Sequence, residues 1–214
     1  MLSSNKGFTL TELLVAMVVG LFIVGGTLAI YATTVSANAG FIRTARLNQE
    51  LRAAVDLISR DIRRAGYRHD AQNDCLGVGY VAYNTNCTAF NAITITASGS
   101  QIEFAYDETS GNAGVIDNGE SHGYRLSGGV IQSKVHDGSN YVWQDVTDGS
   151  NIVVTSLLFT PNTQTIDLDG AGPGTASINI RTIAISISGR LAADSSVTRQ
   201  LTEIVRLRND AFTP

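Results

Sequence analysis

The sequence predicts an α+β fold, in which a long N-terminal α-helix, with a transmembrane half and an amphipathic half, packs on a C-terminal antiparallel β-sheet domain. Three observations predict it. An apolar run extends from Leu13 to Ala32. Apolar residues then recur at steps of three and four as far as Ala65. From Ile93 onward, short segments with period-two patterning alternate with turn sequences.

The apolar run is long enough to cross a bilayer as a helix. No charged residue lies between Glu12 and Arg43, and about twenty helical residues span about 30 Å of hydrocarbon. Glu12 lies at the edge of this span, where an ionised carboxylate facing lipid costs about 2 to 3 kcal/mol unless it has a partner. The segment is therefore expected to enter a membrane, and Glu12 is expected to be functional.

Two simpler interpretations of this segment are an ordinary secretory signal and a plain membrane anchor. Ala37-Asn38-Ala39 has the small-residue pattern of a signal cleavage site. However, the apolar core is too long for such a signal and begins with an acid. A plain anchor explains the length of the run but neither Glu12 nor the Gly7-Phe8 junction.

The stretch Gly7-Phe8-Thr9-Leu10-Thr11-Glu12-Leu13 resembles the class III leader of type IV pilins and type II secretion pseudopilins. The resemblance implies that residues 1–7 are a leader, which a prepilin peptidase removes after Gly7 before it methylates Phe8. Glu12 becomes the fifth mature residue. Its carboxylate can then pair with the new amine of an adjacent subunit, which stabilises both charges in a medium of low dielectric.

The helix is predicted to run over residues 8–66, with residues 8–33 spanning the membrane and residues 41–66 forming an amphipathic half. Gly66 is a suitable stop. One face of the second half is apolar, through Leu47, Leu51, Val55, Ile58, Ile62 and Ala65. A basic cluster ends the helix, formed by Arg60, Arg63, Arg64 and Arg68. We interpret it as cations favoured by the helix dipole rather than as a patch for DNA or lipid headgroups.

Residues 57–68 are similar to the "L-x-x-D-I-R-x-A-G-Y" stretch of PilW-like minor pilins, and J-type pseudopilins of type II secretion carry a related segment. The order of the later elements and the closing Val205-Arg206-Leu207-Arg208-Asn209 also resemble these families. This resemblance implies a pilin-like fold.

Residues 67–92 are predicted to form a loop that contains the only two cysteines of the chain, Cys75 and Cys87. Export would place them in an oxidising compartment, so we expect a disulfide. Such a bridge would stabilise the fold by about 3 kcal/mol. A metal site would need further ligands, and His69 alone does not supply them.

Residues 93–214 are predicted to form the β-rich domain, with a tight hairpin at Gly128-Gly129. The pattern V-x-D-G-S-N occurs twice, beginning at Val135 and at Val146, and indicates recurring turn chemistry. The expected strands are Ile93–Thr96, Gln101–Tyr106, Tyr124–Ser127, Val130–Val135, Tyr141–Val146, Ile152–Thr160, Ile178–Ser188 and Thr198–Leu207.

Nothing in the sequence predicts catalysis, because the three histidines lie in predicted loops and no nucleophile or zinc motif is present. Asp167 and Asp169 begin a D-x-D-G pattern that hard-cation loops use, but the remaining ligands of such a loop are missing. We therefore expect no cofactor, with calcium as the lesser alternative to a plain loop. The net charge of -4 does not favour nucleic acid as a direct partner.

Together, these features predict a PilW-like minor pilin. The resemblance implies an inner-membrane protein with a single span and a periplasmic C-terminal domain, which later lies at the pilus tip on the cell surface. Its partners would be prepilin peptidase and other minor and major pilins, contacted through the helix. The alternatives are a J-type pseudopilin, and a tip adhesin or DNA-capture module that uses loops 69–92, 107–123 and 161–177.

Overall fold

The expected α+β fold is confirmed by the computed structural model, which describes residues 7–67, 93–107, 116–168, 170, 177–208 and 211–213. A single long helix is followed by antiparallel strands among these residues. The chain divides into two compact units, Met1–Ala45 and Arg46–Pro214. The first consists of the apolar part of the helix, and the second contains both sheets.

Helix α1 extends from Leu10 to Arg64. Its N-terminal part is long and apolar enough to cross a membrane, and none of that part is buried against the protein. Threonine hydroxyls in this region donate to backbone carbonyls one turn earlier, as Thr27 does to Ile23 O at 2.8 Å and Thr34 does to Ile30 O at 2.9 Å. Because lipid offers no hydrogen-bond partner, this internal bonding suits a membrane-embedded helix.

Glycine ends the helix close to the predicted position. Gly66 adopts a φ of 76°, a left-handed conformation that residues with a Cβ rarely adopt. Its N–H donates to Ala105 O at 2.9 Å, and Asp107 N–H donates to Tyr67 O at 2.9 Å. The end of the helix is thereby joined to the strand that ends at Ala105.

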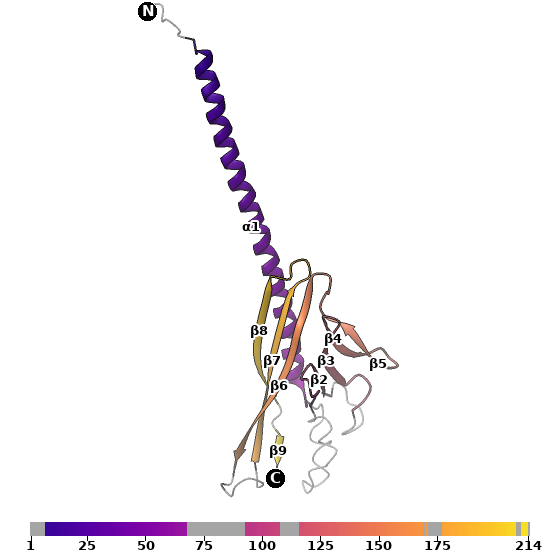
Figure 1. Ribbon diagram of the computed structural model, residues 1–214. Helices are drawn as coiled ribbons and strands as arrows, with labels where there is room; N and C mark the ends of the chain where they lie inside the picture. The colour runs from indigo at the N-terminus through magenta and orange to yellow at the C-terminus, as the bar shows by residue number, and fades with distance from the viewer. Residues whose placement is uncertain are drawn as a thin grey trace, which may run out of the picture. The chain divides into compact units, whose positions relative to one another are not determined.

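The strands form two antiparallel sheets (Figure 1). The five-stranded sheet is a meander in chain order, and in the four-stranded sheet β9 follows β8 along the same edge of β7. The first sheet contains β1 (Thr94–Ile95), β2 (Gln101–Ala105), β3 (Ser121–Ser127), β4 (Val130–His136) and β5 (Tyr141–Asp145). The second contains β6 (Ile152–Asp167), β7 (Ser177–Leu191), β8 (Thr198–Arg206) and β9 (Ala211–Thr213).

The largest departure from the predicted strands is in β6, which continues through Pro161 to Asp167 instead of ending at Thr160. Proline cannot donate a backbone hydrogen bond, which made it a natural strand boundary in the sequence. Among the described strands, β6 pairs with β7 alone and lies at the sheet edge, so a residue without an N–H is tolerated on its outer side. The predicted loop 161–177 is therefore wrong for residues 161–167 and 177, and the predicted loop 107–123 is wrong for residues 121–123, which lie in a strand.

The two V-x-D-G-S-N segments form aspartate-capped turns, as predicted. Asp137 Oδ1 accepts from the backbone N–H groups of Ser139 and Asn140 at 2.9 and 2.7 Å. Asp148 Oδ1 accepts from Ser150 N–H at 2.8 Å. In both turns, the aspartate side chain satisfies backbone donors that would otherwise lack a partner.

One hydrophobic core joins the C-terminal half of α1 to both sheets. Figure 1 shows the part of α1 that belongs to the second unit, from Arg46 to Arg64, running along the four-stranded sheet. The buried helix residues are Leu47, Leu51, Ala54, Val55, Ile58, Ser59 and Ile62. They include five of the six residues of the predicted apolar face, and the sixth, Ala65, is buried directly after the helix. Turns of the first sheet also bond to β6, because Val154 N–H donates to Gly129 O and Phe159 N–H donates to Gly99 O, each at 2.8 Å.

Candidate functional site

The start of α1 is closed by reciprocal hydrogen bonds between Thr9 and Glu12. Glu12 Oε2 accepts from Thr9 N–H at 2.9 Å and from the Thr9 hydroxyl at 2.8 Å. In return, Glu12 N–H donates to Thr9 Oγ1 at 3.3 Å. This arrangement is a capping box, which satisfies donors that the first helical turn leaves without partners.

The capping box gives Glu12 a role within its own helix that the sequence reasoning did not assign. The sequence alone could have indicated this role, because Thr9-Leu10-Thr11-Glu12 matches the T-x-x-E pattern of a capping box. It also places the carboxylate against the peptide N–H that directly follows Phe8. The Glu12 side chain therefore lies beside the position where cleavage after Gly7 would create an amine.

Large apolar side chains cover the surface of the first unit. Phe8 is 89% exposed, Leu21 74% and Phe22 78%. Exposed apolar surface on this scale marks a segment that contacts lipid or other apolar helices. The N-terminal helix thus fits membrane anchoring.

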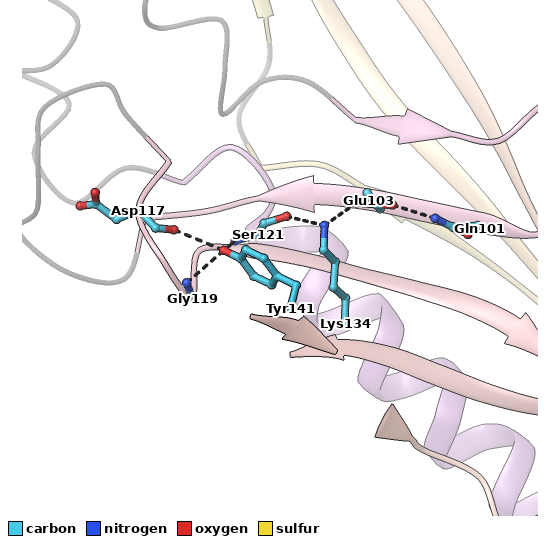
Figure 2. Close-up of polar contacts among 7 residues, drawn as sticks. All are labelled: Gln101, Glu103, Asp117, Gly119, Ser121, Lys134 and Tyr141. Carbon is cyan, nitrogen blue, oxygen red and sulfur yellow. Dashed lines mark hydrogen bonds and ion pairs between the residues drawn. The ribbon is translucent and has the colours of Figure 1, made fainter. Parts of the chain in front are cut away.

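The outer face of the five-stranded sheet carries a polar network that sequence reasoning missed (Figure 2). Glu103, Gly123 and Lys134 are register partners on three neighbouring strands. Because Gly123 has no side chain, the Lys134 side chain reaches across it to form an ion pair with Glu103 and donates to Ser121 Oγ at 3.0 Å. Tyr141 OH accepts from Gly119 N–H at 3.0 Å.

We expect Lys134→Met to lower the free energy of unfolding by about 1 to 2 kcal/mol near pH 7, because it removes a charged hydrogen bond that is partly shielded from water. Burial alone would raise the pKa of Glu103, but hydrogen bonds from Lys134 and Gln101 outweigh burial and hold that pKa below its ordinary value. A lowered carboxyl pKa stabilises the folded state at pH values above the ordinary pKa of the group. This stabilisation is lost as the pH falls through the pKa of the folded state.

The difference in free energy of unfolding between Lys134→Met and the original chain should therefore become smaller as the pH is lowered. Urea unfolding of the full chain in detergent, followed by the fluorescence of Trp143, measures this because Trp143 is the only tryptophan. In a Glu103→Gln background, Lys134→Met should lower the free energy of unfolding by a smaller amount. An equal cost in both backgrounds would contradict a direct interaction between the two side chains.

Two further carboxyl groups are buried close to this network. Glu120 is 3% exposed and Asp107 is 8% exposed. Burial raises the pKa of Glu120, and the neighbouring Asp107 and Asp117 raise it further against the opposing hydrogen bond from Asp117 N–H. Among the described residues, no group of three or more His, Cys, Asp or Glu side chains could hold a metal ion.

The remaining predicted site residues are placed as follows. Cys75, Cys87 and Asp169 lie outside the described residues, so the disulfide and the D-x-D-G calcium alternative stay predictions. Asp167 is the last residue of β6, and its Oδ1 accepts from Gly170 N–H at 2.9 Å, which is a turn contact. His122 stacks on Tyr106, with ring centroids 3.9 Å apart.

A membrane-anchoring helix whose second half packs on antiparallel sheets defines a pilin-like α+β protein. The model of the prokaryotic N-terminal methylation motif matches residues 2–28, which include Gly7, Phe8 and Glu12. The family model described as prepilin peptidase-dependent protein B matches residues 41–207. The chain therefore belongs to the family of prepilin peptidase-dependent protein B, and it is a type IV pilin-like protein. No curated protein and no solved structure matches the chain.

Proposed function

We propose that this protein is a minor pilin, which prepilin peptidase cleaves after Gly7 and methylates at Phe8. In this proposal it associates with other minor and major pilins in the inner membrane and primes assembly. It then lies at or near the pilus tip. The observation that carries the proposal is the match to the methylation motif over residues 2–28, which extends into the exposed apolar helix that begins at Leu10.

The proposed assembly step follows from the placement of charge at the start of α1. An amine at Phe8 and a carboxylate at Glu12 would be costly in lipid if each lacked an opposite charge. Parallel packing of processed helices lets the Glu12 carboxylate of one subunit meet the amine of another. This pairing would fix the axial register of neighbouring helices. The role is structural and requires no catalysis.

Deletion of the gene tests the proposal through the number of surface fibres. We expect few or no fibres in the deletion strain and their return when the original gene is supplied. Immunogold labelling of the protein should mark fibre ends. Normal fibre numbers together with a loss of secreted proteins would instead support a J-type pseudopilin, and normal fibres with lost adhesion or DNA uptake would support a tip module.

A further inference from the structure

A polar groove lies between α1 and β8, and we call it the α1–β8 groove. It consists of two adjoining cavities of about 420 and 280 Å³, which share Asp56 and Glu203 as lining residues. The larger cavity is also lined by Ser59, Arg60, Arg63 and Arg208. Arg60, Arg63 and Arg64 of the basic cluster thus line a cavity beside a strand.

The larger cavity is positively charged within an acidic chain. Among the described residues, four arginines and two carboxylates line it, whereas the whole chain has a net charge of -4. Arg63 pairs with Glu203 at 3.3 Å, and Arg64 lies over the Tyr106 ring at 4.1 Å. These contacts leave the charge of the cavity only partly compensated.

Two of these arginine side chains are not used in contacts within the described part of the chain. The side chains of Arg60 and Arg208 form no hydrogen bond or ion pair with any described residue. An arginine guanidinium presents a planar set of donors that matches a carboxylate in a two-point contact. The pair therefore forms a receptor for a carboxylate that enters the cavity.

Ser59 supplies a second, independent observation. Its side chain lines the cavity and is 2% exposed, yet its hydroxyl has no hydrogen-bond partner among the described residues. Thr27, Thr34 and Thr44 of the same helix each donate to a carbonyl four residues earlier, which Ser59 does not do. A buried hydroxyl without a partner is unfavourable, so the described residues leave this wall of the cavity incompletely satisfied.

The strand beside the groove, β8, has an unpaired edge among the described strands. Among the described strands, β8 pairs only with β7, so its outer edge has no strand partner. Ile204 of β8 is 70% exposed. An open edge with unpaired backbone groups can accept an added extended segment.

We propose that the α1–β8 groove binds an extended, carboxylate-bearing segment of a partner pilin subunit. The backbone of that segment adds to the edge of β8, and its carboxylate contacts Arg60 and Arg208. This inference rests on the proposed minor pilin function, since it supplies the surface and the chemistry by which subunits recognise one another outside the membrane.

Fluorescence anisotropy of the full chain in non-ionic detergent tests the proposal. The probe is a short labelled peptide of alternating threonine and glutamate, and its matched control carries glutamine for glutamate. We expect the glutamate peptide to bind at least about tenfold more tightly, as one charged hydrogen-bond pair would provide. Arg60→Gln combined with Arg208→Gln should weaken its binding by about tenfold or more.

Arg46→Gln is the control, because it removes one positive charge from α1 at an exposed position outside both cavities. It should leave peptide binding unchanged. Equal binding of the two peptides, or equal loss in Arg46→Gln and the double variant, would overturn the proposal. Displacement of the peptide by inorganic phosphate or by phosphatidylglycerol vesicles, but not by acetate, would overturn it in favour of a phosphate site. None of these results depends on fibre formation, so they leave the minor pilin proposal separately testable.

Discussion

Glu12→Gln should leave leader removal intact and reduce incorporation of the protein into fibres by about tenfold or more, the loss expected for a charge pair in a poorly solvated site. Glutamine keeps an oxygen that can accept from Thr9 N–H, so the start of α1 remains capped. It removes only the negative charge. Immunoblotting of sheared fibres against the membrane fraction measures the incorporated share.

Thr9→Ala is the matched variant for this prediction. It removes the hydroxyl contacts of the capping box and keeps the Glu12 carboxylate, so it should destabilise the first helical turn by about 0.5 to 2 kcal/mol. Incorporation into fibres should stay close to normal. If Thr9→Ala blocks incorporation and Glu12→Gln does not, the capping role of Glu12 matters for assembly and its charge does not.

Ile58→Ala should lower the free energy of unfolding of the second unit by about 3 kcal/mol, because truncating a fully buried isoleucine removes apolar contacts and leaves a cavity. Ile58 is 0% exposed in the core where α1 packs on the sheets. A loss of this size is a large fraction of the stability of a small domain. Urea unfolding in detergent, followed by Trp143 fluorescence, measures it.

Leu57→Ala provides the control on the same helix. Leu57 is 39% exposed, and alanine is at least as favourable as leucine in a helix, so the change should cost less than about 1 kcal/mol. Equal destabilisation by both variants would show that helix formation, rather than packing of this face, determines the stability of the unit.

Much of the fold could be predicted because it depends on local patterns. The buried face of α1 follows from apolar residues at helical spacing, and its end follows from Gly66, whose positive φ suits glycine. The extension of β6 past Pro161 could not be predicted in the same way. It depends on β6 lying at a sheet edge, which is a property of the assembled fold.

The same distinction between local patterns and the assembled fold applies to the candidate sites. Gly7, Phe8 and Glu12 could be singled out from the sequence because they lie within one short segment, which the match to the methylation motif also covers. Their roles in cleavage, methylation and charge pairing stay predictions. The ion pair of Lys134 with Glu103 joins residues that only strand register brings together, across Gly123. Likewise, Arg60 and Arg208 come from α1 and from the segment after β8, and the sequence reasoning treated the basic cluster as a feature of the helix alone.

The most direct measurement is the mass of the N-terminal peptide of the protein recovered from wild-type cells. The proposed function predicts a peptide that begins at Phe8 and carries one methyl group on its amine. A parallel sample from cells without prepilin peptidase should retain residues 1–7. Recovery of the full N-terminal segment from wild-type cells, with no methylated Phe8, would contradict the account.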